Sequence, residues 1–333
     1  AATDAVPGAD GAPLAGSVAE LTRVRVDGQD LSMMIRGRSV DNPVLLFLAG
    51  GPGGSELGAM RRHGQALEQD FTVVTFDQRG AGKSYDTLDP TSTLTLDRAV
   101  ADAVEVTEYL RARFHQDKIY LLGNSWGTIL GVLAVRQHPE LYRAYIGSGQ
   151  MVDPRETDQA FYDDTLAWAK RTGNFGVVDT LTSSGPPPYP NVLDYEPVLT
   201  THADEVYPYD HTVNAEGAGG FSENLLVGEY GLLEQLHTLA GFLDVFTVLY
   251  PQLQHIDFRV DATRLRVPLY LIQGEYEVRG RAEPVDDWFR MLDAPRKELV
   301  VLDSAGHRAL FEQPEQFARI MTDTVLADTT PTR

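Results

Sequence analysis

Ser125 lies in the pentapeptide Gly-Asn-Ser-Trp-Gly at residues 123–127, between an apolar run and a stretch with helical spacing. Glycines two residues before and two after a serine permit a sharp turn from strand to helix, which holds the hydroxyl above the sheet edge. The helix that follows also places partial positive charge beside this hydroxyl. The pentapeptide therefore predicts a nucleophilic serine. An ordinary glycine-flanked turn is the alternative, because the chain has 30 glycines.

A nucleophilic serine needs backbone amides that bind the oxyanion of its tetrahedral intermediate. One amide normally follows the nucleophile, which here is Trp126, and another comes from a loop after an earlier strand. The segment AGGPGGS at 49–55 follows an apolar run, so we expect Gly50 or Gly51 to supply the second amide. A phosphate-binding loop is excluded, because neither this segment nor RGAGKS at 79–84 has the spacing of that motif.

The serine also needs a base, and the base needs an acid that orients it. In the chain order serine, acid, histidine, the base follows the last strand, where His307 lies in DSAGH directly after ELVVL. The acid follows the preceding strand, LYLIQG. We predict Glu277, because it lies far enough beyond Gly274 for the turn to direct it toward His307. Glu275 and Asp303 are the alternatives.

Segments with strand and helix patterns alternate around these residues. Apolar runs typical of buried parallel strands cover residues 43–51, 71–80, 118–125, 267–274 and 297–307. Helical spacing marks residues 96–114, 284–292 and 314–326. Two further strands, at 21–26 and 31–38, are expected to form a hairpin around Asp27-Gly28. The alternation predicts an α/β fold with a mostly parallel, doubly wound sheet.

The alternation stops between residues 152 and 262. This segment has helix-like pieces separated by SSGPPPYPN and NAEGAGGFSEN. We interpret it as a helical cap inserted into a core of residues 18–151 and 263–333, with a merely structural extension as the alternative. Residues 1–17 have the composition of a flexible N-terminal segment.

Composition limits the partners. The chain has 48 acidic and 28 basic residues and a net charge of −20, which disfavours nucleic acid or an anionic membrane surface. Cysteine is absent, which excludes disulfides, cysteine-ligated zinc and thiol catalysis, and no apolar run approaches the roughly 20 residues that cross a bilayer. The acidic composition, missing cysteine and processed-looking start favour secretion over a cytoplasmic location. The sequence does not indicate an oligomeric state.

Three segments carry a family resemblance: LAGGPGGS at 48–55, FDQRGAGKS at 76–84 and GNSWG at 123–127. They are similar to the oxyanion loop, the Asp-Gln-Arg-Gly-x-Gly-x-Ser segment and the serine elbow of the proline iminopeptidase branch of the α/β-hydrolases. The resemblance implies a helical cap after the sixth strand.

The same resemblance assigns the catalytic roles. It implies Ser125 as nucleophile, His307 as base and Glu277 at the family's aspartate position. Glu277 is one methylene longer than aspartate, although glutamate takes this role elsewhere in the fold. Ala49 stands where the family usually has a histidine.

The predicted reaction is serine hydrolysis through an acyl-enzyme, without a metal or organic cofactor. By resemblance, the first expectation is an aminopeptidase that removes an N-terminal proline from a short peptide, with Glu223 and Glu229 as cap carboxylates that hold the free amine. Hydrolysis of a small-molecule ester, lactone or amide is the alternative. A ligand-binding protein that retains the triad is a third interpretation, which Ala49 supports. Ser125 argues against the carboxylate nucleophile of epoxide hydrolases and dehalogenases.

Overall fold

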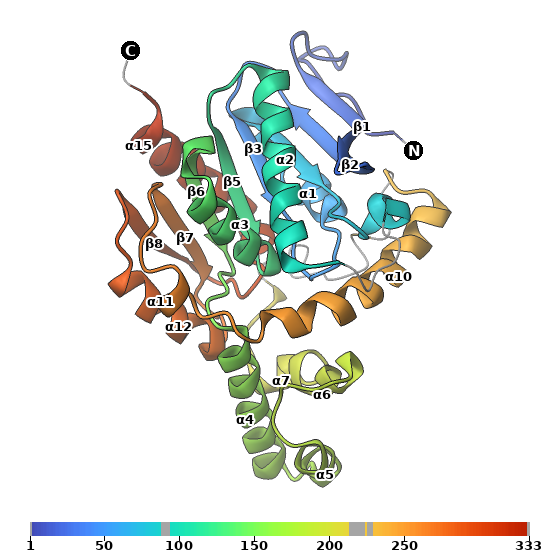
Figure 1. The fold of residues 1–333 in the computed structure, drawn as a ribbon, viewed down its shortest axis with the longest axis vertical. Helices are drawn as coiled ribbons and strands as arrows, with labels where there is room; N and C mark the ends of the chain where they lie inside the picture. The colour runs from blue at the N-terminus through green and yellow to red at the C-terminus, as the bar shows by residue number, and fades with distance from the viewer. Residues whose placement is uncertain (1, 88–93, 213–223, 225–228, 332–333) are drawn as a thin grey trace.

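The structure is a computed structural model that describes residues 2–87, 94–212, 224 and 229–331. Eight strands form one sheet in the order β1-β2-β4-β3-β5-β6-β7-β8 (Figure 1). The pairs β1/β2 and β2/β4 are antiparallel and the other neighbours are parallel, which confirms the predicted mostly parallel sheet. The strands are β1 Val18–Val26, β2 Gln29–Gly37, β3 Val44–Leu48, β4 Thr72–Phe76, β5 Ile119–Asn124, β6 Tyr142–Ser148, β7 Leu269–Gly274 and β8 Lys297–Leu302.

The predicted hairpin joins β1 to β2. Its two turn residues, Asp27 and Gly28, have φ values of 46° and 75°. A two-residue hairpin turn with both central residues at positive φ matches the twist of the strands that it joins. Gly28 adopts this backbone without steric cost, and aspartate tolerates it better than most residues.

Helices cover both faces of the sheet. Along β3, Leu46 and Leu48 join one hydrophobic core, whereas Leu45 and Phe47 join the other. Because side chains alternate between faces, a strand that is buried on both sides is apolar at every position. The first core includes residues of α2 Leu96–Phe114, α3 Trp126–Gln137 and α12 Arg279–Met291, and the second includes residues of α1 Leu57–His63, α13 Ala309–Glu312 and α14 Pro314–Ile320. The C-terminal segment continues as a π-helical turn at Met321–Leu326 and α15 Ala327–Thr329.

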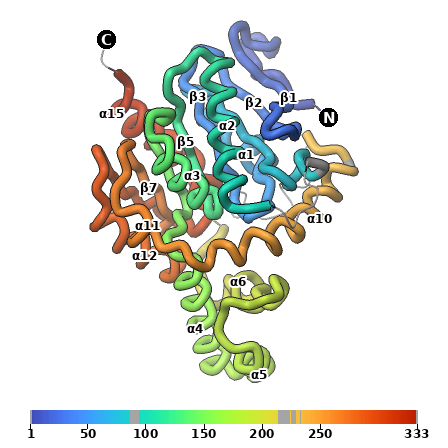
Figure 2. Tube along the Cα trace, in the orientation of Figure 1, coloured from blue at the N-terminus to red at the C-terminus, as the bar shows by residue number. Residues whose placement is uncertain are grey.

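The chain leaves the core after β6 and returns to it before β7. Figure 2 traces this path through α4 and α5, then along α10 to α11. The described part of residues 152–262 contains helices and turns but no strand. Its α-helices are α4 Pro154–Thr172, α5 Phe175–Ser184, α6 Glu196–Leu199, α7 Ala203–Val206, α10 Leu232–Leu249 and α11 Phe258–Asp261.

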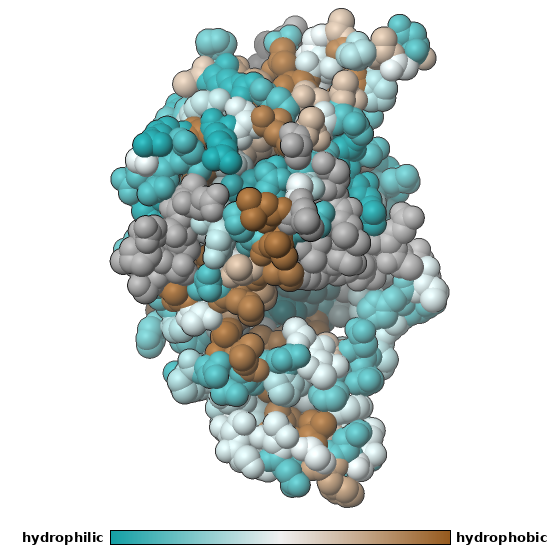
Figure 3. Space-filling view, turned by 90° about the vertical axis from the view of Figure 1, so that its right-hand side faces the viewer, coloured by the Kyte–Doolittle hydropathy of each residue, from teal (hydrophilic) through white to brown (hydrophobic). Residues whose placement is uncertain are grey.

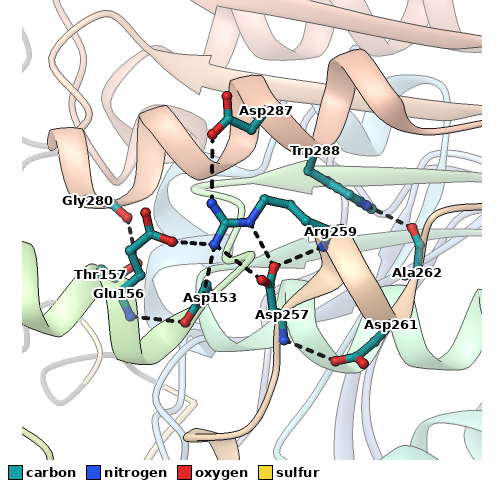
Figure 4. Close-up of polar contacts among 10 residues, drawn as sticks. All are labelled: Asp153, Glu156, Thr157, Asp257, Arg259, Asp261, Ala262, Gly280, Asp287 and Trp288. Carbon is teal, nitrogen blue, oxygen red and sulfur yellow. Dashed lines mark hydrogen bonds and ion pairs between the residues drawn. The ribbon is translucent and has the colours of Figure 1, made fainter.

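Arg259 of α11 connects the start and the end of this inserted segment to the core (Figure 4). Its guanidinium forms ion pairs with Asp153 at 3.1 Å, with Asp257 at 2.9 Å and with Asp287 of α12 at 3.7 Å, and also pairs with Glu156. One cation thus balances carboxylates from three parts of the chain.

Helix α12 begins at Arg279, five residues before the start predicted at Pro284. Proline favours the first turn of a helix, so the sequence pattern placed the start there. Within a helix, Pro284 has no N–H for the carbonyl of Gly280, four residues earlier. The Thr157 hydroxyl donates to that carbonyl instead, at 2.7 Å, and so connects α12 to α4.

The N-terminal segment, which its composition predicts to be flexible, contacts the core. Val6 is buried, and Pro7 pairs with Pro13 in an isolated β-bridge. The Thr3 hydroxyl donates to Glu229 at 2.8 Å and accepts from Arg36 at 2.9 Å. The two partners of Thr3 are distant from it in sequence, so composition does not reveal these contacts.

Helix α10 keeps an exposed hydrophobic face. Figure 3 turns this side of the molecule toward the reader and shows a band of hydrophobic side chains. The exposed leucines of the helix are Leu233, Leu236, Leu239 and Leu243. None of the helices in the described ranges is long and apolar enough to cross a membrane.

Candidate active site

Loops at the carboxyl ends of four parallel strands carry the predicted site residues. Ser125 follows β5, and Gly50 and Gly51 follow β3. Glu277 lies three residues beyond β7, and His307 lies five residues beyond β8. Because parallel strands place their carboxyl ends at one edge of the sheet, these loops lie at the same edge.

Ser125 occupies a strained turn between β5 and α3. Its φ of 54° and ψ of −118° lie outside the regions that most residues adopt. Both flanking glycines are sterically required. A Cβ on Gly123 would lie 2.5 Å from the Gly127 carbonyl oxygen, and one on Gly127 would lie 2.0 Å from the carbonyl oxygen of Leu48. The tight packing of elbow against strand explains the glycine spacing of the pentapeptide.

His307 lies between Ser125 and Glu277. Its Nε2 is 2.8 Å from the Ser125 hydroxyl oxygen, and its Nδ1 is 2.6 Å from Oε2 of Glu277. Glu275, the alternative acid, instead accepts the backbone N–H of Ser304 at 3.1 Å and is exposed. The structure thus brings together the serine, the histidine and the acid that the sequence favoured.

The Glu277 carboxylate is charged in this environment. Burial raises the pKa of Glu277, but the charges of His307 and Arg281 and their hydrogen bonds lower it to about 2. Its Oε1 accepts the N–H of Val278 at 2.9 Å and Nη1 of Arg281 at 3.1 Å. Sequence reasoning missed Arg281. Its position four residues after Glu277, one helical turn on, is the signal that was available.

Contacts with Glu312 and Gly149 support the loop that carries His307. Glu312 of α13 accepts the Gly306 N–H at 2.8 Å and the Tyr209 hydroxyl at 2.6 Å. Gly149 packs against the imidazole, where a Cβ would lie 2.8 Å from Cε1, and its φ of 59° favours glycine. These contacts hold the loop against the core and connect it to the inserted segment.

The loop after β3 has one amide occupied and one available. The N–H of Gly50 donates to the buried carboxylate of Glu56. The N–H of Gly51 has no acceptor among the described residues, and Trp126 is the first residue of α3, where N–H groups have no intrahelical acceptor. Of the predicted oxyanion donors, Gly51 and Trp126 therefore retain amides that can bind an anion.

The Asp-Gln-Arg segment after β4 supports this loop. Gln78 donates to the carbonyl of Ala49 at 3.0 Å and accepts the indole N–H of Trp126 at 2.9 Å, so it connects the loop to the serine elbow. Asp77 accepts the hydroxyls of Ser55 and Tyr230, each at 2.6 Å. Burial raises the pKa of Asp77, and these hydrogen bonds oppose the rise.

A cavity of about 270 Å³ opens beside His307. Residues of the inserted segment and of the loop after β7 line it, among them Phe161, Tyr207, Tyr209 and Tyr276. Tyr209 and Tyr276 stack with ring centroids 4.9 Å apart. The volume is suited to one small acyl group, because drug-sized ligand pockets begin at about 300 Å³.

Of the two predicted amine-binding residues, Glu229 is described by the structure and does not line this cavity. Glu223 lies outside the described residues. Glu229 is buried, with its Oε1 3.0 Å from Nε of Arg61 and 2.8 Å from the Thr3 hydroxyl. Its carboxylate already neutralises an arginine, so we do not propose it as a partner for a substrate's amine. Within the described ranges, no group of three or more histidine, aspartate or glutamate side chains is placed to hold a metal ion.

Comparison with known proteins agrees with this architecture. Residues 43–179 match the family model described as alpha/beta hydrolase fold. A proline iminopeptidase-related protein from Thermus thermophilus superposes with a TM-score of 0.65 at 21% identity, over 94% of this chain and 99% of that one. The protein has the α/β-hydrolase fold. The fold predicted from the alternating segments, and the resemblance carried by the three motifs, are thus confirmed.

Relatives of this protein carry peptidase names. It is 29% identical to a Bacillus subtilis (strain 168) protein named probable aminopeptidase YbaC, over 92% of this chain and 96% of the relative. It is 32% identical to a probable proline iminopeptidase of Leptolyngbya boryana, over 37% of this chain and 36% of the relative. The first similarity extends through the inserted segment, whereas the second covers about a third of each chain.

Proposed function

We propose that this protein is a serine hydrolase with the triad Ser125, His307 and Glu277, and that it removes an N-terminal residue from short peptides. The observation that carries the proposal is the position of His307, whose two ring nitrogens lie 2.8 Å from Ser125 and 2.6 Å from Glu277. This is the geometry of a general base that an acid orients toward a nucleophile.

In the proposed reaction, the Ser125 oxygen attacks the substrate carbonyl carbon while its proton passes to Nε2 of His307. The charge of Glu277 stabilises the imidazolium, and the amides of Gly51 and Trp126 bind the oxyanion. The tetrahedral intermediate collapses when His307 gives the proton to the leaving amine, which leaves an acyl-enzyme on Ser125. Water then adds to the acyl carbonyl with the same base, and the acid product and free Ser125 result.

Two observations support the aminopeptidase assignment. The relative named as a probable aminopeptidase is similar over 92% of the chain, which includes the inserted segment that lines the cavity. The cavity of about 270 Å³ beside His307 accommodates a terminal residue better than the middle of a peptide chain.

Hydrolysis of a small aromatic ester is the second candidate, and the lining of the same cavity supports it. Phe161, Tyr207, Tyr209 and Tyr276 surround the space with aromatic rings. Asp204 and Glu312 are the two acidic side chains of the lining. Glu312 already accepts two hydrogen bonds, and Asp204 lies 3.7 Å from Nε2 of His211, so the lining favours a substrate without an amine.

Initial rates on two chromogenic substrates distinguish the candidates. We expect turnover of a prolyl anilide with a free amine, loss of that turnover when the amine is acylated, and no activity of Ser125→Ala on either form. Cleavage of a short acyl ester without cleavage of the anilide would favour the second candidate. Equal rates of wild type and Ser125→Ala would contradict the triad.

A further inference from the structure

Glu56 is a buried acidic residue that the mechanism above does not use. It is the residue before α1, a position where aspartate and other short polar side chains commonly accept N–H groups of the helix. Its side chain makes no such hydrogen bond. Only 8% of the residue is exposed, so its orientation away from the helix requires other partners.

Those partners belong to the two loops that form the active site. Oε1 of Glu56 accepts the Gly50 N–H, and the Asn124 side-chain amide donates to Oε1 at 2.9 Å and to Oε2 at 3.0 Å. Asn124 directly precedes Ser125, and Gly50 directly precedes Gly51. One carboxylate thus connects the neighbour of the nucleophile to the neighbour of the proposed oxyanion donor.

Gly50 lies between Glu56 and the nucleophile. A Cβ on Gly50 would be 3.1 Å from Oε1 of Glu56 and 3.4 Å from Cβ of Ser125. The peptide between Ala49 and Gly50 is planar, so Glu56 fixes its orientation by holding the Gly50 N–H, and only the two dihedral angles of Gly50 separate this plane from the Gly51 N–H. Fixed donors bind a developing oxyanion without reorganisation during the reaction.

We propose that Glu56 is a positioning residue of the oxyanion hole, which aims the Gly51 amide at the oxyanion by holding the Gly50 amide. Gln78 holds the carbonyl of Ala49, at the other end of the same peptide. Two side chains thus fix one peptide of a loop whose residue 49 is alanine and offers no polar side chain. The inference rests on the proposed function, because it assumes that Ser125 is the nucleophile.

The test compares Glu56→Gln, Glu56→Asp and Glu56→Ala with wild type. Glutamine keeps an oxygen for the Gly50 amide, and its N–H can meet Oδ1 of Asn124, which is buried and accepts no hydrogen bond from the described residues. Aspartate keeps the charge but is too short to reach Gly50, and alanine removes the acceptor. Glu68→Gln is the matched control, because Glu68 is also buried but is paired with Arg36, 3.0 Å away.

The measurements are kcat, KM and the inhibition constant of phenylboronic acid, which forms a tetrahedral adduct on a nucleophilic serine. We expect kcat and boronate affinity to fall together about ten- to a hundredfold in both Glu56→Ala and Glu56→Asp, with KM changed by less than about threefold. Glu56→Gln and Glu68→Gln should stay within about threefold of wild type. Thermal unfolding shows which variants fold.

Other outcomes would overturn the inference. Wild-type kcat in folded Glu56→Ala or Glu56→Asp would show that Glu56 does not position the loop. An equal loss in Glu56→Gln and Glu56→Ala would show that the charge acts, not the hydrogen bond to Gly50. If wild type itself forms no boronate adduct that depends on Ser125, the proposed function fails and this inference fails with it.

Discussion

At the residue scale, the backbone after β7 directs Glu277 and Glu275 to different partners, and this decides which of them is the acid beside His307. Glu277 contacts His307, whereas Glu275 turns outward to the N–H of Ser304. Glu277 could be predicted from the sequence, because the choice depends only on its spacing along the chain beyond β7. The choice between Gly50 and Gly51 could not, because it depends on Glu56, which pairs with the Gly50 amide only in the folded loop.

Glu277→Gln should lower kcat about a thousandfold or more, because an amide does not stabilise the imidazolium and permits the wrong tautomer of His307. Glu275→Gln is the matched control, two residues away in the same loop, and should keep wild-type kcat. Steady-state rates at pH 7 measure both. Similar losses in the two variants would contradict the assignment of Glu277.

The depressed pKa of Glu277 predicts a pH-dependent contribution to stability. Its pKa falls from the ordinary 4.5 to about 2 on folding, so the charged form stabilises the fold above pH 4.5 and this contribution disappears as the pH falls toward 2. We expect wild type to exceed Glu277→Gln in free energy of unfolding by on the order of 2–3 kcal/mol at pH 5.5, and by less at pH 3.5. Urea denaturation at both pH values measures the difference, and a constant gap would be inconsistent with the shift.

At the element scale, the sequence predicted the strands that are apolar at every position and the helix at 96–114, because burial on both faces and helical spacing leave strong patterns. It did not predict α1, which has seven residues, or β6, whose sequence YRAYIGS mixes polar and apolar side chains. It placed the start of α12 wrongly, because the carbonyl left free by Pro284 is satisfied by Thr157 of another helix.

The elbow between β5 and α3 depends on how closely the two elements approach. Gly127 and Gly176 are both the second residue of a helix, but a Cβ on Gly127 would lie 2.0 Å from the Leu48 carbonyl oxygen, whereas one on Gly176 would meet nothing within 4 Å. Gly127→Ala should therefore lower the free energy of unfolding by about 3 kcal/mol or more. Gly176→Ala should leave it unchanged or raise it by up to about 1 kcal/mol. Urea denaturation tests the pair, and equal effects would show that the elbow is not tightly packed.

At the scale of the whole molecule, the inserted segment joins the core through contacts between residues far apart in sequence. Its helical character can be predicted from the sequence. The ion pairs of Arg259 with Asp153 and with Asp287 cannot, because an acidic chain offers many possible partners. The same holds for Glu229, whose partner Arg61 lies 168 residues away.

Arg259→Leu should lower the free energy of unfolding by about 2–3 kcal/mol at low salt, because four carboxylates lose their shared cation. The loss should shrink at high salt, which screens their mutual repulsion. Arg264→Leu is the control, since its pair with Asp293 is exposed on both sides and should contribute less than about 1 kcal/mol. Chemical denaturation at two ionic strengths measures both variants, and a salt-independent loss would contradict the electrostatic explanation.

The central claim is that Ser125 is the nucleophile, and covalent labelling with a fluorophosphonate probe followed by peptide mass spectrometry tests it most directly. We expect one phosphonyl group per chain, located on the peptide that contains Ser125, and none on Ser125→Ala. Labelling at another residue, or no labelling of folded wild type, would contradict the account.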